Sequence, residues 1–276
     1  MEVLEIGESF EEINGDFKYA HTLIVYRVGD DVYHAITKSR CRFAAEVKLE
    51  ELSNVVLIPT TTYCPLFPSN YTRAPDPLPP NCYIKRPHLL SYDRIHDTTN
   101  ASSISERVLK EAEVCEILKL HPHPSIAQYL GCQVRNGRIT GICLTKYSDT
   151  LMHRVNPKSR MKRAFIYDGR ALKNPDDCLY GVERGIRHLH SLGLVHNDIN
   201  PSNIMLDEDT DEEDTPVIID FDSCRPVGES LEGVGRTFEW YDESVQHSLP
   251  SNDLDALNEI REWLRDSGTK HFKFKD

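Results

Sequence analysis

The chain has 276 residues, of which 39% are apolar and 28% charged, and an excess of 44 acidic over 32 basic side chains gives it a formal net charge of −12. This charge disfavours partners that are held through their phosphates, such as nucleic acids. No stretch reaches the roughly 18 to 20 apolar residues of a membrane span, and residues 1–15 lack the basic end and apolar core of a secretory signal. We expect an intracellular, cytoplasmic protein of about two compact units.

Eight cysteines are spread along the chain without a C-x-x-C pair. A chain of this length does not need disulfides to stabilise its core, so we predict free thiols. A zinc site would need thiols beside histidines such as His188, His190 or His196, and no paired thiols stand near them. We therefore interpret these histidines as ordinary helix and loop residues.

The first sixty residues favour strands. Residues 22–28 and 32–37 are rich in β-branched and aromatic residues on either side of a Gly-Asp-Asp turn, which predicts a hairpin. Residues 44–52 predict a short helix before the apolar run that Pro59 closes. Six prolines between positions 65 and 80 exclude a helix or a central strand and predict an extended loop.

The next segments predict a strand at residues 81–87 and a helix from a capping box of Ser103 and Glu106 to about Leu120. A second hairpin follows, in which an Arg-Asn-Gly-Arg turn joins residues 128–134 to residues 139–147.

The second half of the chain changes character. Residues 178–193 have helical periodicity and end at a glycine, as a helix C-cap requires. Seven acids at residues 207–214 predict a solvated loop. A β-rich lobe over residues 1–145 therefore precedes a shortened helical lobe over residues 146–276.

The most informative segment is LVHNDINPSNIML at residues 194–206, followed by VIIDFDS at residues 217–223. Asp198 and Asn203 stand at the two ends of one short loop, and Asp220 ends an apolar strand. Phosphoryl transfer needs a carboxylate to orient the attacking hydroxyl and further oxygens to hold Mg²⁺ on the phosphates. We expect these three side chains to converge.

These motifs resemble the eukaryotic protein kinase superfamily, in which HNDINPSN matches the catalytic loop H-R-D-x-x-x-x-N and DFD matches the metal-binding D-F-G. The whole is similar to atypical fungal kinase-like proteins. The resemblance implies an α+β, two-lobed fold that binds ATP with Mg²⁺. It implies that Asp198 is the base, that Asn203 and Asp220 hold the metal with a possible oxygen from Asp222, and that Lys85 contacts the α- and β-phosphates.

The same resemblance implies a glutamate partner for Lys85. Glu111 and Glu113 both lie within the predicted helix but cannot share a face. We favour Glu113 on its distance to the following HPSI segment, whereas Glu111 has the better apolar pattern, so both stay open. The segment ICLTKYSDT matches the hinge, with Thr145 as gatekeeper and the backbone of Lys146 and Tyr147 facing adenine.

Two further segments extend the resemblance. Residues 235–243 look like the end of an activation segment, and residues 252–257 look like the next helix, with Asp253 as a buried anchor.

The chain also departs from the family pattern. No glycine lies between Val55 and Lys85, which removes the glycine-rich loop over the phosphates. Asn200 replaces the lysine two residues after the base, and Asn197 replaces the arginine that pairs with a phosphorylated activation segment.

Three functions remain open. The first is ATP- and Mg²⁺-dependent transfer of the γ-phosphate to a Ser or Thr hydroxyl of a protein substrate. The second is a pseudokinase, which keeps the fold and binds a partner protein without turnover. The third is a small-molecule kinase similar to choline and aminoglycoside kinases, which share the DFD pattern.

Overall fold

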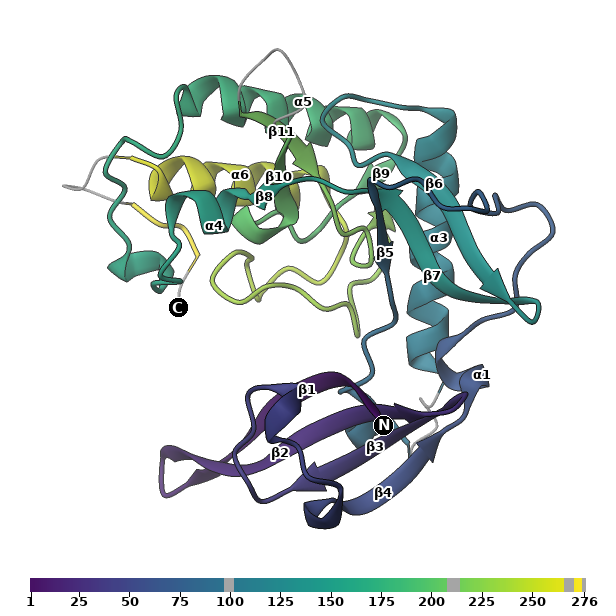
Figure 1. Cartoon of the computed structure of the whole chain (residues 1–276). Coiled ribbons are helices and arrows are strands. Elements are labelled where there is room, and N and C mark those ends of the chain that lie inside the picture. The colour runs from purple at the N-terminus through teal and green to yellow at the C-terminus, as the bar shows by residue number, and fades with distance from the viewer. Residues whose placement is uncertain (97–101, 208–213, 266–270, 275–276) are drawn as a thin grey trace. The chain divides into compact units, whose positions relative to one another are not determined.

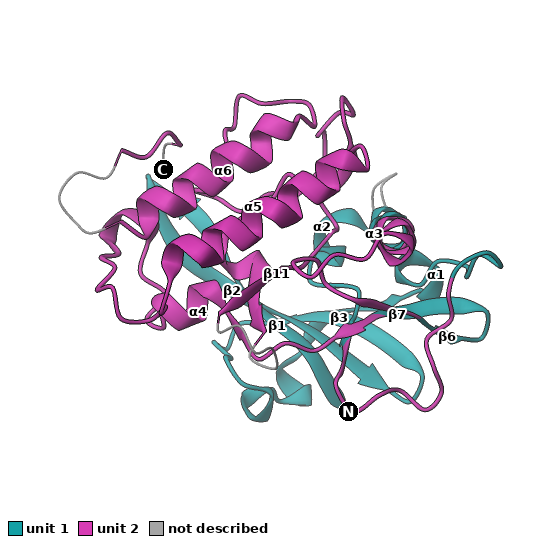
Figure 2. Cartoon of the chain, turned by 90° about the horizontal axis from the view of Figure 1, so that it is seen from above, with its two compact units in different colours: residues 1–71, 84–110, 132–142 teal, residues 72–83, 111–131, 143–276 magenta. Residues whose placement is uncertain are grey.

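The computed structural model describes residues 1–96, 102–207, 214–265 and 271–274. The chain forms two compact units (Figure 2). Unit 1 comprises residues 1–71, 84–110 and 132–142, and unit 2 comprises residues 72–83, 111–131 and 143–276. The sequence predicts a single boundary between the two lobes, after residue 145. In the structure each unit contains three separate stretches of the chain.

Unit 1 begins with a four-stranded antiparallel sheet in the order β1-β2-β3-β4 (Figure 1). Its strands are β1 (Glu2–Ile13), β2 (Asp16–Val28), β3 (Asp31–Thr37) and β4 (Ser53–Ile58). The predicted first hairpin is confirmed, because β2 pairs with β3 around a turn at Gly29, whose φ is 63°. The sequence does not predict β1, which pairs with β2 along its whole length.

Apolar side chains cover both faces of this sheet. One face packs Val25, Val32 and Ile58 against an apolar cluster that includes Leu89, Tyr92 and Ile104. The other face packs Ile24, Tyr26 and Ala35 against Val47 and Leu52. The predicted helix at residues 44–52 is wrong: two single turns replace it, η1 (Ala44–Glu46) and η2 (Leu49–Glu51). Val47 between them is extended and packs on the sheet, and this break in the helix brings its side chain to the core.

A short helix, α1 (Thr60–Tyr63), leads into the proline-rich loop. Residues 64–81 form no helix or strand, as the prolines predict. Within unit 1 the loop is held by backbone hydrogen bonds from Ile139 N to Pro65 O and from Phe67 N to Gly137 O, each 2.9 Å long. Backbone contacts to a neighbouring hairpin therefore order a segment that has no regular structure of its own.

That hairpin belongs to a three-stranded sheet with the order β5-β7-β6. Its strands are β5 (Cys82–Lys85), β6 (Tyr129–Arg135) and β7 (Arg138–Thr145), and the division into units falls within all three. The predicted Asn-Gly turn is confirmed, since Asn136 and Gly137 have φ values of 51° and 72°.

Two helices, α2 (Tyr92–Ile95) and α3 (Ser103–Leu120), lie between β5 and β6 in the sequence. The predicted extent of α3 is confirmed, but its cap is one residue earlier than predicted. The hydroxyl of Ser102, not Ser103, donates to the carboxylate of Glu106 at 2.7 Å.

Among the residues that the structure describes, unit 2 contains the remaining helices and five short strands (Figure 1). The helices are α4 (Leu151–Val155), η3 (Lys162–Ala164), α5 (Pro175–Ser191), η4 (Pro201–Asn203) and α6 (Pro250–Trp263). The strands are β8 (Asp149–Thr150), β9 (Leu194–Val195), β10 (Ile204–Asp207), β11 (Thr215–Ile218) and β12 (Arg225–Pro226). They form two small sheets with the orders β11-β10-β8 and β12-β9.

The helix α5 confirms the predicted helical run, and Gly193 after it has a φ of 75°. Gly181 and Gly185 of α5 lie against β11, where an added Cβ would come within 2.5 Å of Pro216 and 2.9 Å of Ile218. Small residues at these positions let the helix lie directly on the strand that leads to Asp220. The acidic loop predicted at residues 207–214 lies mostly outside the described residues, since 208–213 are not described.

None of the eight cysteines forms a disulfide, as predicted, and seven of them are buried. Among the described residues, no helix is long and apolar enough to cross a membrane. The described part of the chain also holds no cluster of three or more His, Cys, Asp or Glu residues that could bind a metal ion.

Candidate active site

The predicted catalytic loop follows directly from α5. Gly193 turns the chain into β9, η4 brings Asn203 to the start of β10, and β10 pairs with β11 from Ile204↔Ile218 to Asp207↔Thr215. The backbone bond from Ile219 N to Asn203 O, 3.0 Å long, joins the end of the loop to the residue before Asp220. This short hairpin therefore places the backbone of Asn203 beside that of Ile219, one residue before Asp220, and the convergence of the side chains stays a prediction.

Asp198 is half-buried and holds a dense set of hydrogen bonds. Its Oδ2 accepts from Asn203 Nδ2 at 3.0 Å and from Thr237 Oγ1 at 2.9 Å, and its Oδ1 accepts from Thr237 N at 2.7 Å. These bonds fix the carboxylate in one orientation. The sequence predicts that Thr237 lies at the end of an activation segment but gives no sign that it binds Asp198.

Burial raises the pKa of Asp198 above its ordinary value of 3.8, because water no longer solvates the charged form. The hydrogen bonds from Thr237 and the neighbouring His196 lower this pKa, and the negative charge of Asp220 raises it further. A raised pKa suits a group that accepts a proton during a reaction.

Asn203 could supply a metal ligand. Its Nδ2 donates to the backbone and side chain of Asp198, both at 3.0 Å, and within the described part of the chain its Oδ1 has no hydrogen-bond donor. The amide oxygen of Asn203 and a carboxylate such as that of Asp220 are both ligands of the kind that Mg²⁺ binds. Because two protein oxygens are too few for the ion, phosphate oxygens and water would complete its coordination.

Asp220 and Asp222 flank Phe221 directly after β11. Asp220 has a φ of 66°, a left-handed conformation that Asp adopts more readily than most residues. Asp222 accepts a hydrogen bond from the hydroxyl of Ser223 at 3.0 Å through Oδ1. Its predicted role as a further metal ligand stays a prediction.

His196 and Asp253 stabilise the catalytic loop through hydrogen bonds. His196 Nδ1 accepts from Asp198 N at 3.3 Å, so its Nε2 carries the proton and donates to Ile219 O at 3.0 Å. Asp253 of α6 is fully buried and accepts hydrogen bonds from the backbone of the loop. The predicted buried anchor is confirmed.

The two candidate glutamates of α3 lie in different environments. Glu111 is 4% exposed, and its Oε1 accepts from Phe221 N at 3.2 Å, whereas Glu113 is exposed. Glu111 is thus connected to the D-F-D segment, as its apolar sequence pattern favoured, and Glu113 faces solvent. The pairing of either glutamate with Lys85 stays a prediction.

Lys85 is the last residue of β5 in unit 1 and is half-buried. Thr145 ends β7 in unit 2, where its backbone and side chain both bond to Gln128, at 2.9 and 3.0 Å. Lys146 N donates to Asn81 O at 2.7 Å, and the phenol of Tyr147 accepts from Gln128 N at 3.2 Å. The backbone of the predicted hinge is thus fixed locally, and its role in binding adenine stays a prediction.

Asn200 takes part in the site without a charge. Its Nδ2 donates to Thr237 Oγ1 at 3.0 Å and to Asp198 O at 3.1 Å, and its Oδ1 accepts from Ser202 N at 2.9 Å. Asn200 therefore orients Thr237 toward Asp198 but supplies no cation for a phosphate.

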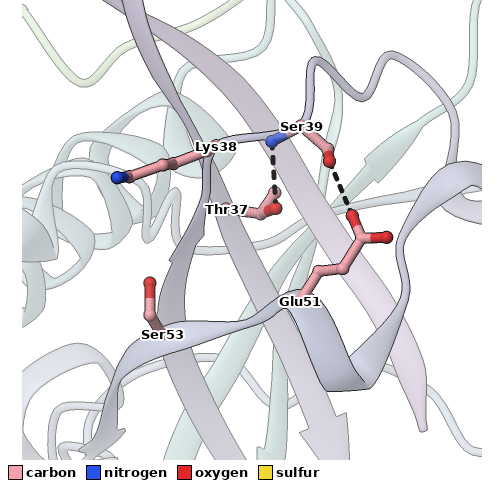
Figure 3. A pocket seen from close by; sticks show the side chains of 5 residues that line it. All are labelled: Thr37, Lys38, Ser39, Glu51 and Ser53. Atoms are coloured by element: carbon pink, nitrogen blue, oxygen red, sulfur yellow. Dashed lines mark hydrogen bonds between the residues drawn. The ribbon is translucent and has the colours of Figure 1, made fainter.

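A separate pocket of about 310 Å³ lies in unit 1 (Figure 3). Its lining side chains are Thr37, Lys38, Ser39, Glu51 and Ser53. The hydroxyl of Ser39 donates to Glu51 at 2.6 Å, and Lys38 points away from this pair (Figure 3). This pocket contains none of the predicted site residues.

A family model of the protein kinase domain matches residues 90–243, which is more than half of the chain. The chain belongs to this family. The match includes Asp198, Asn203 and Asp220, and it confirms the α+β, two-lobed kinase-like fold expected from the sequence. Members of the family act on protein substrates with ATP and a divalent metal ion.

The related proteins are protein kinases from several organisms. The chain is 28% identical over 118 residues to the serine/threonine-protein kinase/endoribonuclease IRE1 of Hypocrea jecorina, which covers 42% of this chain and 9% of that protein. It is 30% identical over 116 residues to the serine/threonine-protein kinase SSK22 of Saccharomyces cerevisiae, covering 41% of this chain and 8% of that protein. It is 36% identical over 63 residues to the mitogen-activated protein kinase p38b of Drosophila melanogaster, covering 23% of this chain and 16% of that protein. The chain thus spans less than a fifth of the length of these relatives.

Proposed function

We propose that this chain is a protein serine/threonine kinase that transfers the γ-phosphoryl group of ATP to a hydroxyl of a protein substrate. The observation that carries the proposal is the carboxylate of Asp198, which Asn203 and Thr237 hold in a fixed orientation. The relatives named above are all protein kinases, which favours a protein acceptor over a small molecule.

Each site residue has a role in this proposal. Asp198 orients the acceptor hydroxyl and takes its proton, and its raised pKa favours that transfer. Asn203 Oδ1 and Asp220 would hold Mg²⁺, which when bound neutralises charge on the phosphates. Of the two candidate glutamates we propose Glu111, because it is buried and accepts a hydrogen bond from Phe221 N, whereas Glu113 is exposed.

The neutral Asn200 limits the rate we expect. It stands where a cation would stabilise the charge that develops on the transferred phosphate, and all its side-chain atoms are engaged in local hydrogen bonds. Losing one such electrostatic contact costs about 10²- to 10³-fold in rate in other enzymes. We therefore propose a slow kinase.

Phosphate transfer from radiolabelled ATP to a general protein substrate tests this function. We expect Mg²⁺-dependent labelling by the purified chain and its loss in Asp198→Asn, which keeps the size of the side chain but cannot take up a proton. The control is Asp176→Asn, an exposed aspartate of α5, which should label like the wild type. Equal labelling by Asp198→Asn and the control would remove the proposal.

A pseudokinase is the second candidate, and the bonds of Thr237 favour it. Thr237 donates to both oxygens of Asp198, so an acceptor hydroxyl has to share a carboxylate that is already engaged. Thermal melting with Mg²⁺-ATP separates the two functions. A ligand at 100 times its dissociation constant stabilises by about 2.7 kcal/mol, so a shift without any labelling would identify a nucleotide-binding pseudokinase.

A further inference from the structure

The β1–β2 hairpin of unit 1 extends past the rest of its sheet (Figure 1). β3 pairs with β2 only from Thr22 onward, so residues 8–21, which we call the hairpin arm, pair with each other and with no third strand among the described residues. β1 is also the edge strand of the sheet, and no backbone hydrogen bond from another described segment reaches it. The arm therefore presents a free strand edge, at which a further strand can pair.

One face of the arm carries a strip in which carboxylates and aromatic rings alternate. Side chains two residues apart on a strand lie on the same face, which places Glu8, Phe10 and Glu12 together on β1. The register sets Tyr19 of β2 opposite Phe10, and their rings meet edge to face with centroids 6.3 Å apart. It sets Phe17 opposite Glu12. We call these five side chains the aromatic strip.

The inner half of the aromatic strip binds an arginine of the same chain. Arg40 Nε donates to Glu8 Oε1 at 2.7 Å, and Arg40 Nη2 donates to Glu8 Oε2 at 2.8 Å. The same guanidinium lies over the ring of Tyr19, 5.4 Å from its centroid. The forked pair of hydrogen bonds needs a planar guanidinium, which lysine does not have. A carboxylate beside an aromatic ring on this face is therefore a site for arginine.

The outer half of the strip repeats this pattern without such an arginine. Glu12 is exposed, and within the part of the chain that the structure describes no basic side chain forms an ion pair with it. Phe10 is 47% exposed and Phe17 is 75% exposed, whereas Tyr19, which contacts Arg40, is half-buried. A carboxylate between two exposed rings is complementary to a second guanidinium in charge and in shape.

We propose that the outer half of the aromatic strip is a docking site for an extended segment of a partner protein, whose arginine binds Glu12 and lies against Phe10 and Phe17. The backbone of such a segment can pair with the free edge of β1, as in other cases of strand addition. Charge disfavours a second copy of this chain as the occupant, because each copy carries a net charge of −12. The proposal involves none of the residues of the candidate active site and does not depend on phosphate transfer.

Binding of a labelled peptide to the full chain tests this site. The probe is a short peptide that alternates arginine with valine, so that its arginines share one face when it is extended. The comparison peptide has lysine in place of arginine. In fluorescence anisotropy at about 0.05 M NaCl, we expect the arginine peptide to bind about fivefold more tightly or better, because only the guanidinium forms the forked bond. Raising NaCl to about 0.5 M should weaken the binding, because solvent reaches the strip.

Glu12→Gln removes the carboxylate and keeps the length of the side chain. We expect it to raise the Kd of the arginine peptide by about tenfold or more, since hydrogen bonds to a charged group are among the stronger ones. Glu11→Gln is the matched control, because Glu11 is also exposed but lies on the opposite face of the arm, across from Lys18. Both variants lose one negative charge, so a difference between them reports the strip and not the net charge.

Phe17→Ser tests the aromatic part of the site. Loss of the ring should raise the Kd of the arginine peptide by about threefold or more, which corresponds to an exposed cation–π contact. Ile13→Ser is the control, since Ile13 is exposed at the same end of the arm but on its opposite face. All four substitutions are at exposed positions, and each variant should melt at the temperature of the wild type.

Hydrogen exchange shows where the peptide binds. With the arginine peptide bound, exchange should slow in residues 8–13 of β1 and stay the same in residues 31–37, which form β3 inside the sheet. Slower exchange in another segment, without a change in residues 8–13, would mean that the peptide binds elsewhere and would overturn the proposal.

Three further results would overturn it. They are a wild-type chain that does not bind the arginine peptide, equal affinities for the arginine and lysine peptides, and equal affinities of Glu12→Gln and Glu11→Gln. Sedimentation of the chain alone tests the rival occupant: a dimer at micromolar concentration that Glu12→Gln dissociates would show that a second copy, not a partner protein, occupies the strip. If the peptide binds as expected but the chain transfers no phosphate, the proposed function fails and this inference stands.

Discussion

Asp253 of α6 holds the backbone of His196 from within the core of unit 2. Its Oδ2 accepts from His196 N at 2.9 Å, and its Oδ1 accepts from the next backbone nitrogen, that of Asn197, at 2.8 Å. The carboxylate is fully buried, and His190 Nε2 lies 2.9 Å from Oδ2. The start of the catalytic loop therefore depends on a single side chain that lies 57 residues away.

Replacing Asp253 with alanine should lower the free energy of unfolding by about 3 kcal/mol. Two buried backbone N–H groups would lose their acceptor, and hydrogen bonds to a charged group are among the stronger ones. Asp255→Ala is the control, because its ion pair with Lys273 is exposed and should contribute less than about 1 kcal/mol. Urea unfolding measures both, and similar losses in the two variants would show that Asp253 is not the anchor of the loop.

The elements that the sequence predicts well are those with strong local signals. The hairpin at Asn136 and Gly137 and the helix that ends before Gly193 both follow from residues that favour one backbone conformation. The helix predicted at residues 44–52 fails because Val47 packs on the sheet of unit 1, and that long-range contact outweighs local helix propensity. The strand β1 was missed because its many glutamates conceal the alternation that it shares with β2.

In the candidate site too, some features follow from local sequence and others depend on long-range contacts. Asp198, Asn203 and Asp220 follow from a motif, whose spacing within one loop and one hairpin predicts that they converge. The hydrogen bonds from Thr237 to Asp198 span 39 residues, and they depend on the path by which residues 223–248 return toward the catalytic loop. No local pattern encodes that path. Apolar residues stand three, four and seven positions after Glu111, and this helical pattern predicts that Glu111 is buried. The pattern is the better signal for choosing between the two glutamates.

Glu111 and Glu113 allow a direct comparison within one helix. Glu111→Ala should destabilise the chain by about 1 to 3 kcal/mol, because Phe221 N would lose its acceptor in a buried position. Glu113→Ala changes an exposed side chain and should stay within about 0.5 kcal/mol of the wild type. If Glu111 also supports nucleotide binding, its variant alone should lose the thermal shift with Mg²⁺-ATP. The reverse order of effects would point to Glu113.

The raised pKa of Asp198 predicts a pH dependence of stability. The stability contributed by this group is fully present below its ordinary value of 3.8, and it is lost as the pH rises through the higher pKa of the folded state. Asp198→Asn does not titrate, so its stability relative to the wild type should increase as the pH rises from about 3 to about 7. Thermal unfolding across this range measures the trend.

Asp242→Asn is the matched control because its hydrogen bonds from Ser244 lower the pKa of Asp242. The stability from this group is present above its ordinary value of 3.8 and is lost as the pH falls through its lower pKa in the folded state. Asp242→Asn should therefore lose stability relative to the wild type over the same rise in pH. Slopes of the same sign for the two variants would contradict the directions of both pKa shifts.

A buried lysine joins Glu239 to α6. Lys162 is 3% exposed, forms an ion pair with Glu259, which is 2% exposed, and donates to Glu239 O at 2.7 Å. Its Nζ also lies over the rings of Trp240 at 4.9 Å and Phe272 at 4.5 Å. Each charge is therefore out of water and depends on the other for its stabilisation.

Lys162→Met should lower the free energy of unfolding by about 3 to 5 kcal/mol, because it leaves the carboxylate of Glu259 buried without a counter-charge. The double variant with Glu259→Gln removes that uncompensated charge and should be more stable than Lys162→Met alone. Lys273→Met breaks an exposed ion pair with Asp255 and should cost less than about 1 kcal/mol. Urea unfolding of the wild type, Lys162→Met, Glu259→Gln and the double variant measures the coupling. A double variant that loses the sum of its two single losses would mean that Lys162 and Glu259 stabilise the fold independently of each other.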